Sequence, residues 1–311
     1  MNPAFSVVFF TTLAGAAQGL VVALAIAALA GLAVGAGFNA TMLAVAAVML
    51  VVSLGCSFLH LGRPERAWRA ATMWRTSWLS REVIVLPAFI AVVVLWGVAV
   101  RTGAPLTWTR FAIPVAALGL AALLWLCTAM IYACLRFVEE WAHPLTLAGF
   151  VLIGLSSGFL LAVTAARLAG EGELARACGP AAIVLTLLAG GVRLLALRRN
   201  ARIRHRSTLQ SATGIAATRL VQTSMGMSAG SFNTREFFHR ASALGMRRAR
   251  ALLVVLGFAL PALLAALGLA TTAPWPWLAA AIVQAPGLVV DRWFFFAQAK
   301  HPQNLYYQVV S

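Results

Sequence analysis

The sequence predicts an all-α polytopic membrane protein with eight transmembrane helices. Of its 311 residues, 62% are hydrophobic and only 10% are charged, which is too few charges to solvate a globule of this size. The apolar residues form continuous runs of about 20, the length that a helix needs to cross a bilayer. Because these runs do not alternate apolar and polar positions, they exclude the strands of a membrane β-barrel.

The first four predicted spans are separated by breaks that contain glycine, arginine or proline. The chain leaves its first apolar run near Gly35, its second at the arginine-rich stretch 61–81, and its third at Arg101. The first run has no lysine or arginine before it and is too long for the core of a signal peptide, so we expect it to stay as a helix. The predicted spans are 5–31, 39–60, 82–100 and 111–135.

The last four spans are bounded by charged residues and prolines, with one long interruption. Breaks begin at Glu139 and Glu171, and a shorter break runs from Thr272 to Pro276. The predicted spans are 144–166, 177–197, 251–271 and 276–297. We treat 1–311 as a single integral membrane domain in which 198–250, rich in arginine, is a docking segment outside the bilayer.

Eight spans place both termini on the same side of the membrane. Eighteen arginines and lysines fall on that side, against four on the other. Because short, positively charged loops stay in the cytoplasm, we expect a multi-pass protein of the bacterial inner membrane with cytoplasmic termini. The formal net charge of +16 is then a topology signal, and it does not indicate a nucleic-acid-binding protein.

The cysteines and histidines argue against a metal or a haem in this chain. The cysteines lack the two-residue spacing of a metal site. All the histidines fall on the side of the termini or at helix ends that face it, whereas a b-type haem needs histidines inside two separate spans. Electrons would therefore have to arrive from another subunit. The residues concerned are Cys56, Cys127, Cys134, Cys178, His60, His143, His205, His239 and His301.

The polar segment between the second and third predicted spans contains the strongest candidate site. His60 ends the second span and Glu82 opens the third, so both lie at the same membrane depth and can share a pocket. A neutral imidazole there can donate a hydrogen bond to a quinone carbonyl and pass a proton at neutral pH. The other interpretation of Glu82 is simple helix capping, because it follows Ser80, a plausible N-cap.

Arginines and tryptophans surround this pair. Arg63 or Arg81 can stabilise negative charge on a quinone that is being reduced. Most arginines of 61–81 also fit retention charges and contacts with lipid phosphates, and the tryptophans fit an interfacial belt.

A second polar stretch lies inside the docking segment. Phe232, Asn233, Arg235 and Glu236 combine aromatic and charged side chains in the way that partner interfaces do. The same residues could instead lie flat on lipid.

Three motifs resemble the membrane-anchor subunits of dimethyl sulfoxide reductase-type molybdoenzymes, an eight-helix, quinone-interacting family. They are the sequence FLHLGRP at 58–64, Ser80 to Glu82, and SFNTRE at 231–236. The resemblance implies that His60 and Glu82 take part in quinol binding. It also implies an iron–sulfur partner that connects the anchor to a molybdopterin catalytic subunit. Iron–sulfur clusters and molybdopterin would belong only to the partners, and the cofactor of this chain would be ubiquinone or menaquinone.

The cytoplasmic orientation refines this resemblance. The sequence looks most like the anchors of cytoplasmic sulfite dehydrogenase complexes, in which electrons from sulfite pass through iron–sulfur clusters to quinone. An anchor that oxidises menaquinol for a DMSO reductase-like complex stays open, and so does a purely structural anchor. A secondary transporter is the remaining alternative, with Gln18 and Gln284 as candidates for its midplane site. Together with Asp291, these polar residues within spans are expected to face the bundle interior.

Overall fold

The computed structural model describes residues 1–59, 61–224, 238–239 and 241–306. Within them, eight helices are long and apolar enough to cross a membrane, and no strand occurs, which confirms the predicted fold class. Several spans combine two or three labelled elements. The spans are α1 (Phe5–Leu29), α2 (Ala36–Phe58), α3 (Trp78–Arg101), η2 with α4 (Thr107–Ala133), α5 (Pro144–Ala169), α6 (Gly172–Asn200), α9 with η3 and α10 (Ala243–Thr271), and α11 (Trp275–Ala297).

The seventh span differs most from its predicted bounds. It begins at Ala243, eight residues before the predicted start at residue 251. The Ser242 side chain caps the helix by accepting a hydrogen bond from the Gly245 N–H at 3.1 Å. A capped helix can thus continue through a basic turn that precedes the apolar run. The end of the docking segment is therefore helical.

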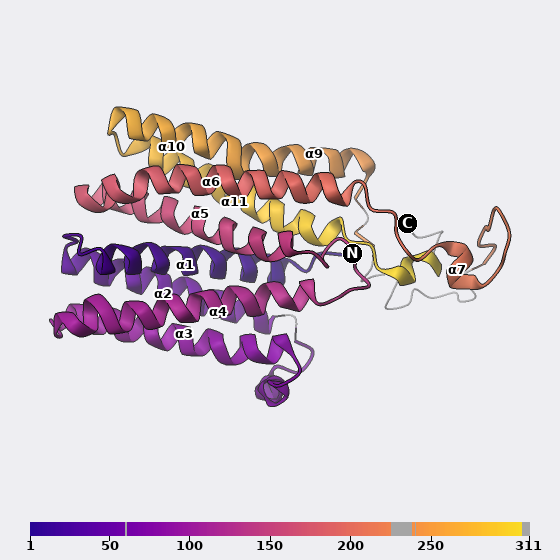
Figure 1. The fold of residues 1–311 in the computed structure, drawn as a ribbon, viewed down its shortest axis with the longest axis horizontal. Coiled ribbons are helices and arrows are strands. Elements are labelled where there is room, and N and C mark those ends of the chain that lie inside the picture. The colour runs from indigo at the N-terminus through magenta and orange to yellow at the C-terminus, as the bar shows by residue number, and fades with distance from the viewer. Residues whose placement is uncertain (60, 225–237, 240, 307–311) are drawn as a thin grey trace.

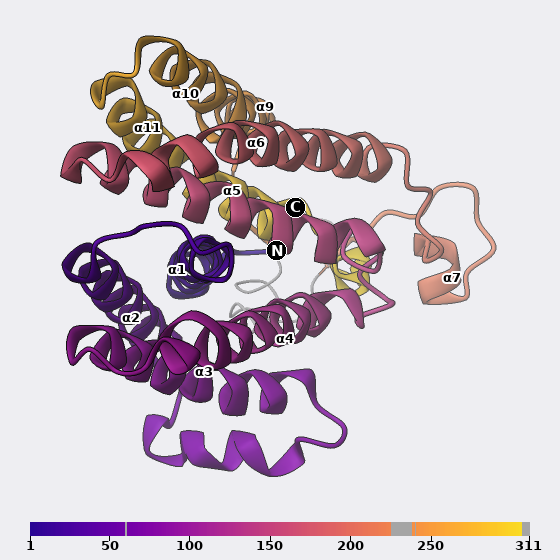
Figure 2. The same cartoon turned by 60° about the vertical axis from the view of Figure 1, so that its left-hand side comes forward.

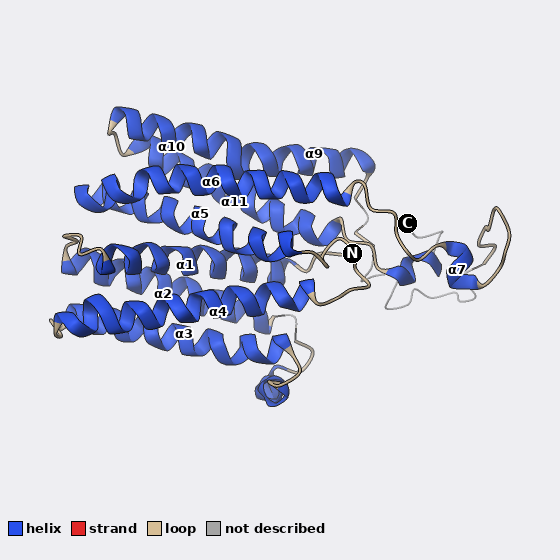
Figure 3. Cartoon of the chain, in the orientation of Figure 1, coloured by secondary structure: helices blue, strands red, loops and turns tan. Residues whose placement is uncertain are grey.

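The spans run side by side along the long axis of the molecule, and both termini lie at one end, which we call the terminal face (Figure 1). Figure 3 shows helices joined by loops throughout the bundle. Helix α1 lies between two groups of helices (Figure 2): it packs against α2 and α4 on one side and against α5 and α11 on the other. Short helices α7 (Leu209–Thr213) and η4 (Pro302–Tyr306) project beyond the spans at the terminal face.

Glycines allow α1 and α5 to cross closely. Gly15 and Gly19 are one turn apart on α1, and Gly154 and Gly158 are one turn apart on α5. A Cβ atom added to Gly158 would overlap the backbone of Gly19 and Leu20. Small residues at such positions let two helices meet through their backbones, which favours association inside a membrane. This crossing joins the two groups of helices.

Polar residues within the spans face the interior, as predicted. Gln18 on α1 is 2% exposed, and its amide donates a hydrogen bond to the Ala121 carbonyl of α4 at 3.1 Å. Gln284 on α11 donates to Ser156 Oγ of α5 at 3.0 Å. Each buried amide therefore joins two helices.

Replacing Gly158 with alanine should destabilise the protein. The added Cβ has to push α1 and α5 apart, at a cost of about 1–3 kcal/mol for overpacking. We expect a lower thermal unfolding temperature of the purified protein in detergent. Gly149→Ala, also on α5 but with open space around the glycine, is the matched control and should leave this temperature unchanged. Equal behaviour of the two variants would contradict the close crossing.

Candidate functional site

Helix α3 places Glu82 in its second turn. The N-cap is Ser77, whose hydroxyl accepts a hydrogen bond from the Ser80 N–H at 3.3 Å. The prediction that Ser80 is the cap is therefore wrong, since both serines precede the apolar run and only the loop geometry selects between them. Because no acidic residue lies in the first turn of α3, the capping interpretation of Glu82 is wrong as well.

The Glu82 side chain points into the bundle and is 5% exposed. The hydroxyl of Thr128, on α4, donates a hydrogen bond to Glu82 Oε1. Among the described residues, no basic side chain forms an ion pair with Glu82. A carboxylate that is buried without a cation is energetically costly, so this arrangement fits a group that binds and releases a proton.

An aromatic cluster fixes the end of α4 that carries Thr128. Tyr132, one turn further on, stacks on Phe150 of α5 with ring centroids 5.8 Å apart, and it meets Trp141 edge-on at 5.3 Å. Phe295 and Phe296 of α11 complete the cluster. The cluster ties α4 to α5 and α11, and so holds the partner of Glu82 in place.

The two arginines predicted beside the quinone have different surroundings. Arg63 is exposed and precedes a short helix, η1 (Pro64–Met73). Arg81 turns back toward the preceding loop, where it donates hydrogen bonds to the carbonyls of Trp74 and Arg75, both at 2.9 Å. Its guanidinium also lies over the Trp78 ring at 4.2 Å. Arg81 therefore fixes the loop that leads into α3.

Several predicted site residues lie outside the described residues. These are His60 and the predicted docking contacts, which are Phe232, Asn233, Arg235 and Glu236. The chain before His60 ends α2 at Phe58 on the terminal face, the same face on which α3 begins.

A buried charged cluster lies in the other half of the bundle, and of its residues the sequence predicted only Asp291 to face the interior. Arg193 of α6 forms an ion pair with Asp291 of α11 at 2.5 Å, and both side chains are almost completely buried. Arg292 is 3% exposed, and its guanidinium lies 3.8 Å over the Phe150 ring. The missed signal was an arginine inside an apolar run, which usually marks a buried partner.

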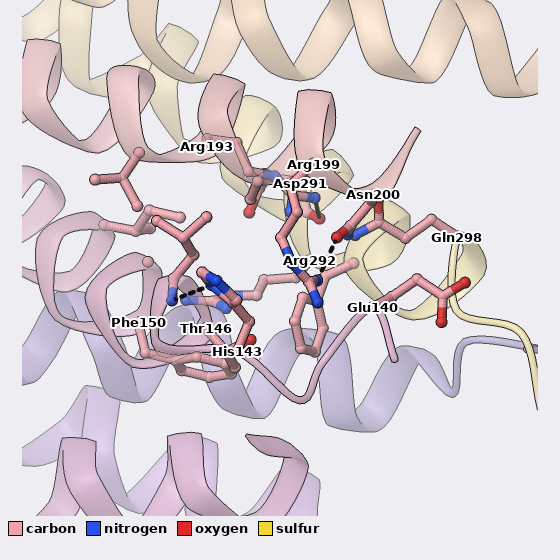
Figure 4. Close-up of a pocket in the computed structure, with 16 residues that line it drawn as sticks. Glu140, His143, Thr146, Phe150, Arg193, Arg199, Asn200, Asp291, Arg292 and Gln298 are labelled. Atoms are coloured by element: carbon pink, nitrogen blue, oxygen red, sulfur yellow. Dashed lines mark hydrogen bonds and ion pairs between the residues drawn. The ribbon is translucent and has the colours of Figure 1, made fainter. Parts of the chain in front are cut away.

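These residues surround a cavity of about 30 Å³, enough for about two water molecules (Figure 4). His143, at its edge, caps α5 by accepting a hydrogen bond from the Leu145 N–H at 3.2 Å. Burial, reinforced by Arg199, lowers the pKa of His143, which favours the neutral ring that accepts this bond. Glu140 is buried 3.6 Å from His205. Three arginines and two acidic residues line this cavity, so its formal charge is positive.

A larger cavity of about 470 Å³ opens on the terminal face. Its lining includes His205, His239 and His301, from three separate parts of the chain. Within the described part of the chain, however, no three histidine, cysteine or acidic side chains gather closely enough to hold a metal ion.

Comparisons with known proteins agree with the resemblance drawn from the motifs. The family model described as DMSO reductase anchor subunit (DmsC) matches residues 1–270. The chain is also similar to a sulfite dehydrogenase subunit of Allochromatium vinosum. The two are 46% identical over 327 aligned positions, which cover all of both chains.

Removing one partner of the buried ion pair should be more harmful than removing both. Asp291→Leu leaves the Arg193 guanidinium buried without its counter-charge, which costs about 3–5 kcal/mol. The double variant Arg193→Met/Asp291→Leu removes both charges and should recover most of the thermal unfolding temperature. If the double variant is as unstable as the single one, the pair has no charge-balancing role.

Proposed function

The chain belongs to the DMSO reductase anchor subunit family, and from this premise we propose that it is the quinone-binding membrane anchor of a molybdopterin and iron–sulfur oxidoreductase complex. Its partners are an iron–sulfur subunit and a molybdopterin catalytic subunit. The anchor passes electrons between the iron–sulfur subunit and ubiquinone or menaquinone in the membrane. It performs none of the molybdenum chemistry itself.

The observation that carries this proposal is the environment of Glu82. Reduction of a quinone consumes protons together with electrons, and hydrocarbon lipid supplies none. Glu82 offers a carboxyl group at membrane depth, 5% exposed and held by the neutral hydroxyl of Thr128. A group held in this way can exchange its proton without breaking an ion pair. This is what a proton relay at a quinone headgroup requires.

The other residues of the proposed site come from the same stretch of sequence as Glu82, residues 60–82. His60 donates a hydrogen bond to a carbonyl of the quinone headgroup. Glu82 takes its proton from the terminal face and passes it toward the headgroup. Arg63 and Arg81 contribute positive charge to the site, and Arg81 does so from its place over Trp78. Quinone, when bound, supplies the redox chemistry.

We further propose that the catalytic partner oxidises sulfite. The relative that is 46% identical over its whole length is a sulfite dehydrogenase subunit. The positive loops of the terminal face favour a cytoplasmic orientation in the inner membrane. The partners would then dock on the cytoplasmic side, where the segment 198–250 and its residues Phe232, Asn233, Arg235 and Glu236 would contact them.

The family description favours a second candidate, an anchor that oxidises menaquinol for a DMSO reductase-like complex. Glu82 would then accept a proton from the quinol instead of delivering one to the quinone. The two candidates differ in the side of the membrane on which the catalytic partner lies. A catalytic partner with a twin-arginine export leader would lie outside the cytoplasm and would support the second candidate.

Replacing Glu82 with glutamine should uncouple the complex from quinone. Glutamine keeps the size of the side chain and an oxygen that can accept the Thr128 hydrogen bond, but it cannot relay a proton. We expect a loss of about 10²-fold or more in sulfite-dependent quinone reduction, with unchanged activity toward an artificial acceptor. Glu65→Gln, an exposed glutamate on η1, is the matched control. Full quinone activity in Glu82→Gln would remove the basis of the proposal.

Replacing His60 with alanine should have the same selective effect. Alanine can neither donate the hydrogen bond nor exchange a proton. Quinone-coupled activity should be abolished, while assembly of the complex and artificial-acceptor activity stay intact. Loss of assembly would instead assign His60 a structural role.

A further inference from the structure

Helix η1 and the turn after it sort their side chains onto three faces. η1 is a 3-10 helix of 10 residues, and in such a helix residues three apart lie directly above one another. The first face carries two alanines and ends at a methionine, the second carries two tryptophans, and the third is basic. The faces contain Pro64, Ala67, Ala70 and Met73; Glu65, Trp68, Ala71 and Trp74; and Arg66, Arg69, Thr72 and Arg75.

The protein partly covers η1 at its three alanines, whereas Met73 is 60% exposed. Ala67, Ala70 and Ala71 are half-buried, and η1 packs against α3. Trp68 is 70% exposed and Trp74 is 53% exposed. Two large aromatic side chains are therefore left uncovered next to the basic face, whose arginines are also exposed.

The orientation of η1 identifies what covers the tryptophans. Figure 1 views η1 end-on, as the purple coil beneath the terminal-face end of α3, while the spans run across the picture. The helix therefore lies roughly perpendicular to the spans, at the side of the bundle and at the level where α3 begins. In a membrane-spanning protein that position is the boundary between acyl chains and headgroups.

We propose that η1 is an interfacial helix seated on lipid. Its tryptophan face contacts the boundary of the acyl chains, and its basic face contacts the phosphates of anionic lipids. Tryptophan is the residue that favours this depth, and arginines add attraction to an anionic leaflet. Arg81 connects η1 to α3, because it donates hydrogen bonds to the Trp74 and Arg75 carbonyls just after η1.

Brominated lipids test this seat directly. Wild-type complex and the Trp68→Phe/Trp74→Phe variant are placed in nanodiscs of phosphatidylcholine and phosphatidylglycerol, with or without bromine on the acyl chains near the headgroup. Subtracting the tryptophan fluorescence of the variant from that of the wild type leaves the fluorescence of Trp68 and Trp74 alone. We expect the brominated lipids to quench most of the fluorescence of Trp68 and Trp74. If they leave this fluorescence unchanged, the proposal is overturned. The control is Trp141→Phe, buried at the same face, whose difference signal should not be quenched.

Photo-crosslinking gives a second measurement that needs no quinone activity. p-Benzoylphenylalanine at position 68 is irradiated in native membranes, and the adducts are identified by mass spectrometry. Phospholipid adducts are expected, and adding Arg66→Gln, Arg69→Gln and Arg75→Gln should reduce the share of phosphatidylglycerol among them. An adduct to a partner protein would show that protein covers η1, and would overturn the lipid seat.

Discussion

The absence of hydrogen-bonding partners in a bilayer constrains every polar group of this protein. Each backbone and side-chain polar atom at membrane depth has to be satisfied by the protein itself. Gln18 and Gln284 meet this requirement by joining pairs of helices, and Arg193 meets it with Asp291. Glu82 differs from the buried carboxylate of Asp291 because its hydrogen-bond donor is a neutral hydroxyl and not a cation. The proposed proton relay follows from that difference.

Packing between the two groups of helices gives this site a rigid frame. The glycines of α1 and α5 bring the groups together. Nearer the terminal face, Tyr132 stacks on Phe150 and joins α4 to α5, and Arg292 of α11 lies over the same Phe150 ring. Thr128, one turn from Tyr132, is thus held against Glu82 by contacts that reach across both groups. A relay that depends on one hydrogen bond benefits from such a frame.

Local patterns predicted the spans, whereas the site depends on contacts between distant residues. Runs of apolar residues bounded by charges predict the eight helices to within about five residues, except for the earlier start of the seventh span, because membrane insertion depends on the same property. The pairing of Glu82 with Thr128 and of Arg193 with Asp291 depends on how helices rotate against each other, which no local pattern encodes. The N-cap of α3 is Ser77 and not the predicted Ser80, because the shape of the preceding loop decides which serine caps the helix.

We propose that this chain connects an iron–sulfur subunit to membrane quinone. The most direct test compares the catalytic and iron–sulfur subunits purified with and without this chain, matched for sulfite oxidation with an artificial acceptor. We expect sulfite-dependent reduction of a quinone analogue only when the chain is present. Equal quinone reduction without the chain, or purification of the chain without any iron–sulfur or molybdenum partner, would contradict it.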